Sequence, residues 1–207
     1  MQSSPRRVGL YGGAFDPPHR THVALARAAL KQLQLDVLHV VPTGQAWHKQ
    51  RSLTAAEHRL AMCRLAFADL PHTLVDARET QRSGPSYTLD TVQELQAQYP
   101  QAQIYLLMGE DQAHALPQWH RAGELVRAAI ICVASRPDAE DSGQTAAKAG
   151  ALPDLLPGLV LQTLQLPPSP LNATEIRARA AQGQSVSALV FASVARYIDQ
   201  YHLYPSA

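Results

Sequence analysis

Short apolar runs alternate along the chain with stretches in which apolar residues recur at helical spacing. The runs lie at residues 8–11, 37–41, 72–77, 104–108, 129–134 and 159–166. After the first run, Val23, Ala26, Leu30 and Leu33 follow at spacings of 3, 4 and 3, which places them on one face of a helix. Repeated alternation of strand and helix predicts an α/β fold: a Rossmann-like, doubly wound parallel sheet with helices on both faces.

Further segments have the marks of helices. Thr54-Ala55-Ala56-Glu57 is a capping-box pattern, which predicts a helix from there to about Leu70. Residues 88–99 are also helical in pattern, and prolines at 167, 168 and 170 precede a small C-terminal helical extension at about 171–204. Residues 138–158, rich in Ala, Gly, Asp and Pro, are interpreted as a peripheral helix or a loose insertion. No internal repeat is visible, and residues 1–207 are interpreted as a single domain.

The composition narrows the class of ligand. Hydrophobic residues make up 46% of the 207 residues, which is enough for a substantial core. The 18 basic and 17 acidic residues nearly cancel, and the net charge of +1 argues against an extended nucleic-acid surface. A small anionic ligand remains compatible with this balance, because a few local charges suffice to bind it.

Two further features concern the location of the protein. Cys63 and Cys132 lie in apolar stretches and are expected to be buried thiols. No apolar run of a signal peptide follows residues 1–7, and no apolar stretch approaches the roughly 20 residues of a membrane helix. We therefore expect a cytoplasmic protein without membrane or nucleic-acid partners, and the sequence is compatible with a homo-oligomer.

The run Gly12-Gly13-Ala14-Phe15-Asp16-Pro17-Pro18-His19-Arg20-Thr21-His22 carries the strongest chemical signal. It lies between the first strand and the first helix, so we interpret it as a strand, a glycine-rich turn and a helix start. Backbone N–H groups and a helix N-terminus in this arrangement can face an anion, with His19 and His22 near one another at the helix mouth. The predicted task is binding a polyphosphate and stabilising its charge.

Other phosphate and metal motifs are missing from the sequence. There is no G-x-x-x-x-G-K-[ST] run and no G-x-G-x-x-G run. The two histidines are not spaced as H-E-x-x-H, and no cluster of Cys or carboxylate residues accompanies them. We therefore predict no protein ligands dedicated to a metal ion.

The glycine-histidine run resembles the signature of the T/HxGH nucleotidyltransferases, with Thr21 where that family usually has Gly. Residues 171–177, Leu-Asn-Ala-Thr-Glu-Ile-Arg, resemble the family's Ile-Ser-Ser-Thr-x-Ile-Arg motif, with Asn172 and Ala173 in place of the two serines. On its own this segment is a helix start with Asn172 or Thr174 as N-cap. Its helix N-terminus, the Thr174 hydroxyl and the fork of Arg177 would also suit a triphosphate.

The middle of the chain is similar to one branch of that family, the bacterial nicotinate-mononucleotide adenylyltransferases. The similar segments are residues 42–49, 79–91, 108–111, 119–120, 135–137, 194–198 and 203–204, so the resemblance spans about 8–204. It implies an enzyme that transfers an adenylyl group from ATP to nicotinate mononucleotide, with Mg²⁺ accompanying ATP. Nicotinamide-mononucleotide and phosphopantetheine adenylyltransferases remain alternatives, the latter disfavoured by Ser86-Tyr87-Thr88 and Trp119. A non-catalytic nucleotide-binding sensor of the same fold is a third.

The resemblance also implies roles for individual residues. His19, His22 and Arg177 would be catalytic. The ATP site would comprise Gly12, Gly13, Phe15, His19, His22, Gly109, Asp111, Arg136, Thr174 and Arg177, and the mononucleotide site Asp16, Lys49, Tyr87, Thr88, Trp119 and His120.

Several of these residues also have a simpler interpretation. Trp119 and Tyr87 could be packing aromatics, and Asp111 could cap the short helix after Gly109. Lys49 and Arg136 could be solvated loop charges, and Glu79 and Arg82 could pair with each other and hold their loop. These alternatives stay open on the sequence.

Overall fold

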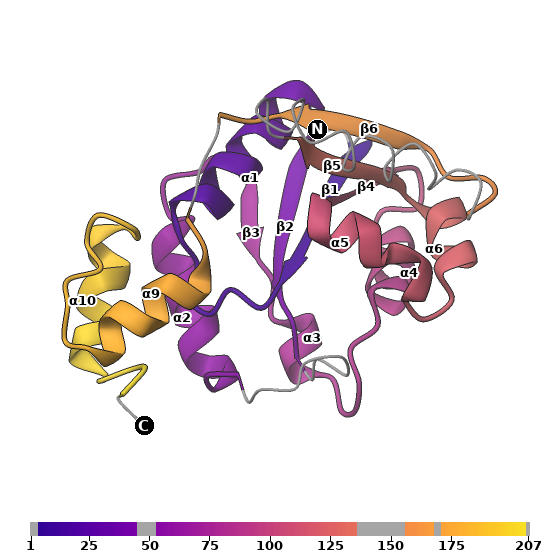
Figure 1. The fold of residues 1–207 in the computed structure, drawn as a ribbon. Helices are drawn as coiled ribbons and strands as arrows, with labels where there is room; N and C mark the ends of the chain where they lie inside the picture. The colour runs from indigo at the N-terminus through magenta and orange to yellow at the C-terminus, as the bar shows by residue number, and fades with distance from the viewer. Residues whose placement is uncertain (1–3, 45–52, 136–155, 168–170, 206–207) are drawn as a thin grey trace.

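The computed structural model describes residues 4–44, 53–135, 156–167 and 171–205. Six strands form one parallel sheet in the order β3-β2-β1-β4-β5-β6 (Figure 1). The chain therefore starts at the centre of the sheet, runs outward on one side and then returns to the other side. The strands are β1 (Arg7–Gly13), β2 (Val37–Pro42), β3 (Thr73–Val75), β4 (Gln103–Gly109), β5 (Ile130–Ser135) and β6 (Leu161–Gln165).

Helices cover both faces of the sheet, because successive strand residues point to opposite sides. In β2, Leu38 and Val40 join the apolar cluster beneath α1, α2, α9 and α10, whereas Val37 and Val41 join the cluster beneath α4, α5 and α6. The doubly wound prediction is confirmed, and α9 and α10 form the C-terminal extension beside α2 (Figure 1). The helices are α1 (Arg20–Gln32), α2 (Ala56–Ala66), α3 (Arg78–Gln81), α4 (Thr88–Gln98), α5 (Glu110–Ala115), η1 (Leu116–Gln118), α6 (Ala122–Ala128), α9 (Ala173–Ala181) and α10 (Ala192–Gln200).

Two local predictions at the site are corrected. Gly12 and Gly13 belong to β1 and not to the turn after it, because they pair in register with Val41 and Pro42 of β2. The predicted capping box is wrong, since α2 begins after Ala55 without a side-chain cap. The backbone N–H of Thr54 instead donates to Oδ2 of Asp16 at 3.2 Å. This tertiary hydrogen bond replaces the local one that the Glu57 side chain would accept in a capping box.

Other boundaries shift by a few residues. Helix α2 ends at Ala66 rather than near Leu70, because Phe67 and Leu70 turn into the core. Strand β3 spans three residues of the predicted six, since His72 has a left-handed φ of 55° just before it. Both cysteines are buried as predicted. Most of the predicted insertion at 138–158 lies outside the described residues. Among the described helices, none has the length and apolar character needed to cross a membrane.

Candidate active site

A cleft of about 900 Å³ opens at the carboxyl ends of β1 and β4, where the chain order in the sheet reverses. Ligands of open α/β sheets bind at such a reversal. The cleft brings together every predicted site residue that the structure describes; these are Gly12, Gly13, Phe15, Asp16, His19, His22, Tyr87, Thr88, Gly109, Asp111, Trp119, His120, Thr174 and Arg177. Lys49 and Arg136 lie outside the described residues.

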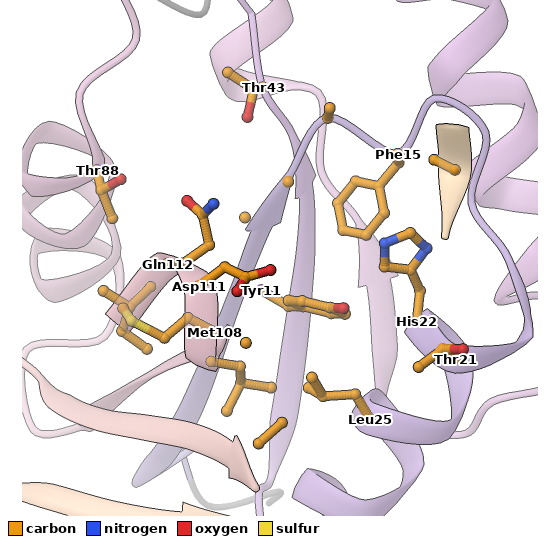
Figure 2. Close-up of a pocket in the computed structure, with 18 of the residues that line it drawn as sticks. Tyr11, Phe15, Thr21, His22, Leu25, Thr43, Thr88, Met108, Asp111 and Gln112 are labelled. Atoms are coloured by element: carbon orange, nitrogen blue, oxygen red, sulfur yellow. The ribbon is translucent and has the colours of Figure 1, made fainter. Parts of the chain in front are cut away.

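We call residues 12–22 and 172–177 the histidine wall, and residues 79–88 and 119–120 the aromatic wall. Figure 2 shows His22 and Phe15 on one side of the cleft and Thr88, Asp111 and Gln112 on the other. The ring of Tyr11 lies between the two sides (Figure 2). Both walls line the same cleft, so a single ligand in it can contact both of them.

Phe15 anchors the loop of the histidine wall. It has a left-handed φ of 47°, an uncommon conformation for a residue with a side chain, and its ring is buried. The ring packs edge-on against Tyr11, Phe67 and His22, which holds this conformation in place. A Cβ on Gly13 would come within 3.2 Å of the Phe15 ring, so Gly suits this position, whereas a Cβ on Gly12 would meet no atom within 4 Å. The backbone at Gly12 is thus open to close approach by a ligand.

The two histidines form a closely packed pair at the start of α1. His19 is the residue before the helix and His22 lies in its first turn, with the ring centroids 3.7 Å apart. The backbone N–H of His19 donates to Nδ1 of His22 at 3.0 Å. Nδ1 of His22 therefore carries no proton, and in the neutral ring the proton sits on Nε2, which makes Nε2 a hydrogen-bond donor.

His19 is the more buried of the pair. Its side chain is 6% exposed, and its Nδ1 makes no hydrogen bond to any residue that the structure describes. Burial lowers the pKa of His19 to about 4, so the imidazole is neutral near pH 7. An anion beside the ring would favour the protonated form and oppose this shift.

The segment 172–177 completes the histidine wall from the other end of the chain. Asn172 is the N-cap of α9, as one of the two predicted options had it, because its Oδ1 accepts the N–H of Glu175 at 2.8 Å. Arg177 Nη1 donates to the carbonyl oxygen of Asp16 at 2.8 Å, and its Nη2 to Oγ1 of Thr174 at 3.1 Å. Arg177 thus joins the two segments that the sequence assigns to phosphate binding.

The aromatic wall presents rings and helix starts. Tyr87 and His120 stack with centroids 4.0 Å apart and an angle of 24° between the planes. Thr88 is the first residue of α4, and Trp119 follows η1 on the same wall. Asp111 is not a helix cap, since Gly109 precedes α5 and Asp111 lies inside its first turn. Its side chain extends toward the middle of the cleft (Figure 2).

Charged side chains support the aromatic wall from behind. Glu79 is buried and its Oε1 accepts the hydroxyl of Thr91 at 2.8 Å; burial raises the pKa of Glu79 although this hydrogen bond opposes the shift. Arg82 forms an ion pair with Glu94 at 2.6 Å, and its Nη2 also donates to the Thr91 hydroxyl at 3.4 Å. Glu79 and Arg82, for which a direct pair was one alternative, are therefore linked through Thr91. Gly44 packs so closely that a Cβ there would overlap the carbonyl oxygen of Glu79.

Sequence reasoning missed several residues of the cleft. Thr43 directly follows β2, and Glu110 and Gln112 start the helix after β4. All three lie at carboxyl ends of strands, so the rule that ligands gather there could have identified them. The partners of Asp16 had no such signal, because Thr54 and Tyr204 lie 38 and 188 residues away in the sequence.

Comparison with known proteins agrees with this geometry. The cytidylyltransferase-like family model matches residues 10–179. The chain is 51% identical to the "Probable nicotinate-nucleotide adenylyltransferase" of Albidiferax ferrireducens, over 98% of this chain and 100% of the relative. It is 42% identical to the protein of that name from Methylibium petroleiphilum, over 99% of this chain and 95% of the relative.

Solved structures share the fold at low sequence identity. The Plasmodium falciparum nicotinic acid mononucleotide adenylyltransferase complexed with NaAD superimposes with a TM-score of 0.78 and 17% identity, covering 96% of this chain and 97% of the other. The same protein complexed with APC gives a TM-score of 0.76. With the cleft in the expected place and the sequence relatives matching along at least 95% of their length, the chain belongs to the nicotinate-nucleotide adenylyltransferases of the cytidylyltransferase-like family.

Proposed function

We propose that this protein transfers the adenylyl group of ATP to nicotinate mononucleotide, giving nicotinate adenine dinucleotide and pyrophosphate in NAD biosynthesis. The observation that carries the proposal is the meeting of His19, His22, Thr174 and Arg177 with the aromatic wall in one cleft. The first group suits a triphosphate, and the second suits a flat heterocycle that carries a carboxylate. The relatives with this name support the choice of reaction.

The chemistry requires positioning and charge neutralisation more than proton transfer. The phosphate of the mononucleotide is already an oxygen nucleophile at neutral pH. It forms a bond to the α-phosphorus of ATP while the bond from that phosphorus to the bridging oxygen breaks, and pyrophosphate departs with the electron pair. The protein must hold two anions in line and stabilise the charge that develops on the α-phosphate and the leaving group.

The histidine wall is suited to this task. Nε2 of His22 can donate to a phosphate oxygen, because its Nδ1 is occupied by the N–H of His19. The Thr174 hydroxyl and the guanidinium of Arg177 can donate to the leaving pyrophosphate. Gly12 and Gly13 allow the β1 backbone to approach the α-phosphate, with Phe15 fixing the loop.

The remaining predicted residues complete the two subsites. Gly109, Asp111 and Arg136 would hold the adenosine part of ATP. Trp119 would stack on the pyridine ring, backbone N–H groups near Thr88 and His120 would hold the ring carboxylate, and Tyr87, Asp16 and Lys49 would complete the mononucleotide site. These roles are proposals, which the cleft supports for the residues that the structure describes.

Mg²⁺ is proposed to enter with ATP. Among the described residues, no group of three or more His, Cys, Asp or Glu side chains could hold a metal ion. We therefore propose that the phosphates of ATP and water molecules supply most ligands of the ion. When bound there, Mg²⁺ would neutralise part of the triphosphate charge. Cytoplasmic location and the lack of a nucleic-acid partner stay predictions, and the sequence stays compatible with a homo-oligomer.

The test is acceptor choice. Initial rates of pyrophosphate release are measured at saturating ATP and Mg²⁺ with nicotinate mononucleotide, nicotinamide mononucleotide and phosphopantetheine. We expect kcat/KM for the nicotinate form to exceed that for the amide by roughly 10², equivalent to ~2.7 kcal/mol. The proposed site holds the ring carboxylate with N–H donors, and an amide NH₂ cannot accept hydrogen bonds from those donors. Trp119→Ala should weaken both pyridine acceptors without reversing their order.

The other outcomes separate the alternatives. A preference for the amide or for phosphopantetheine would reject the acceptor proposed here while keeping adenylyl transfer. Binding of ATP without pyrophosphate release for any acceptor would favour the non-catalytic sensor.

A further inference from the structure

The C-terminal end of the chain reaches the histidine wall through one tyrosine. The hydroxyl of Tyr204 donates to Oδ1 of Asp16 at 2.8 Å, across 188 residues of sequence. Burial and the neighbouring Asp16 carboxylate raise the pKa of Tyr204, so its hydroxyl keeps its proton and acts as the donor. Tyr204 lies behind Asp16, outside the set of described residues that line the cleft.

Asp16 is a point where several segments meet. Its side chain is 1% exposed, and while Oδ1 accepts from Tyr204, Oδ2 accepts the backbone N–H of Thr54 at 3.2 Å. Its carbonyl oxygen accepts Arg177 Nη1 at 2.8 Å. The residue before it is Phe15, whose left-handed backbone needs support from its surroundings. These contacts give the Asp16 carboxylate a structural task, beside the place in the mononucleotide site that we propose for this residue.

The tail that carries Tyr204 is itself held in place. The N–H of Leu203 donates to the carbonyl oxygen of Ile198 at 3.0 Å, and Leu203 packs on the apolar cluster beneath α1 and α2. Tyr204 has a left-handed φ of 62°, an uncommon conformation for a residue with a side chain. Such a conformation persists only where neighbouring contacts fix it.

We propose that Tyr204 is a positioning residue for adenylyl transfer: it fixes the Asp16 carboxylate, and through Asp16 it sets the loop that places Phe15, His19 and His22 against the phosphates. This inference rests on the proposed function. It assigns Tyr204, near the C-terminal end of the described residues, to the support of the active site, although no atom of Tyr204 needs to touch a substrate.

The test compares two tyrosines of the C-terminal part. Tyr204→Phe removes only the hydroxyl that meets Asp16. Tyr197→Phe, the matched control, removes a hydroxyl that meets Nδ1 of His58 at 3.0 Å, between α10 and α2. Steady-state rates are measured with ATP and nicotinate mononucleotide at a temperature where circular dichroism shows both variants folded.

We expect Tyr204→Phe to lower kcat/KM for ATP by about 10-fold or more, since a small displacement of catalytic groups has effects of this size. Tyr197→Phe should stay within about twofold of the parent protein. In an Asp16→Asn background the additional effect of Tyr204→Phe should shrink to about twofold, because the two residues act through one contact. A merely structural tyrosine would lower Tm without this difference between the variants.

Two results would overturn the positioning role. One is an equal kcat/KM for the two Tyr→Phe variants. The other is a Tyr204→Phe variant that lowers kcat/KM by the same factor in the Asp16→Asn background as in the parent protein. If the parent protein transfers no adenylyl group, the proposed function fails, and the role of Tyr204 is then judged by the Kd for ATP from calorimetry. A Kd for ATP that rises about 10-fold in Tyr204→Phe and not in Tyr197→Phe supports the positioning role, and equal Kd values for the two variants reject it.

Discussion

The two walls of the cleft are held together in different ways. Contacts of the histidine wall join residues far apart in the sequence, with separations of 38, 45, 161 and 188 residues. Contacts behind the aromatic wall join near neighbours, with separations of 9, 12 and 16 residues. The histidine wall therefore depends on contacts with distant parts of the chain, whereas the polar contacts behind the aromatic wall form within residues 78–94.

The chemical nature of the contacts differs as well. The histidine wall depends largely on hydrogen bonds that involve backbone groups, such as those from Arg177 and from Arg59 to carbonyl oxygens. The aromatic wall depends on half-exposed ion pairs around Glu94, whose side chain is 45% exposed. We therefore expect mutation and acid to lower activity or stability mainly through the histidine wall. Salt should lower stability mainly through the ion pairs behind the aromatic wall.

The largest effect is expected from the histidines. His22→Ala should lower kcat by about 10² or more, because the loss of one donor to the developing charge typically costs ~3 kcal/mol, and His19→Ala should act similarly. The measurement is pyrophosphate release under saturating substrates, with circular dichroism to confirm folding. His114→Ala, on α5 and outside the residues that line the cleft, is the control. Near-normal turnover in the folded double variant would remove the histidines from catalysis.

Acid should weaken the fold through His19 in a defined window. The native pKa of His19 is about 4, against an ordinary value of 6.5, so between these pH values the unfolded chain binds a proton that the native chain does not. Stability therefore falls as the pH drops from 6.5 to 4, by on the order of 3 kcal/mol from this residue.

His19→Asn isolates that contribution. Urea unfolding at pH 7 and pH 4 should show a smaller loss of stability in the variant than in the parent protein. If the difference in the free energy of unfolding between the two proteins were the same at pH 7 and pH 4, the result would contradict the burial of His19.

Arg177→Lys should have an intermediate effect. The charge is kept, but one ammonium group cannot reach the carbonyl of Asp16, Thr174 and a phosphate together. We expect kcat/KM for ATP to fall about 10-fold, or ~1.4 kcal/mol, with little change in the KM for the mononucleotide. Arg179→Lys on the same helix, where the arginine pairs with Glu175, is the matched control. If both variants keep full activity, residues 172–177 are only a capped helix start.

The smallest effect is expected behind the aromatic wall. Glu94→Gln removes a carboxylate that pairs with Arg82 and Arg78, and because these pairs are partly exposed we expect a loss of under about 1 kcal/mol of stability. The loss should disappear near 1 M NaCl, where the Debye length is about 3 Å. Glu124→Gln breaks a more exposed pair with Arg121 and serves as the control for thermal unfolding. A salt-independent loss would show that the Glu94 pairs are effectively buried.

The sequence predicted the sheet and the cleft because both follow from local patterns. Alternating runs specify strands and helices, and chemically distinctive residues that follow strands, such as His19 and Asp111, must gather at one edge of a parallel sheet. The capping pattern at Thr54 failed because a distant carboxylate, Asp16, takes its N–H. The glycines at the end of β1 were misread because a neighbouring strand supplies their register. Contacts of that kind depend on the complete fold, so no local pattern reveals them.

Because both cysteines are buried, labelling of their thiols can report when the protein unfolds. Cys63 and Cys132 are the only thiols in the chain, and burial raises the pKa of both, that of Cys132 to about 12. Since only the thiolate attacks a maleimide, native molecules should stay unlabelled and each opening event should leave a permanent mass tag. Cys63 lies on α2 beneath the C-terminal helices, and Cys132 lies on β5 in the sheet. The order in which the two are tagged would therefore tell whether the C-terminal end detaches before the sheet opens.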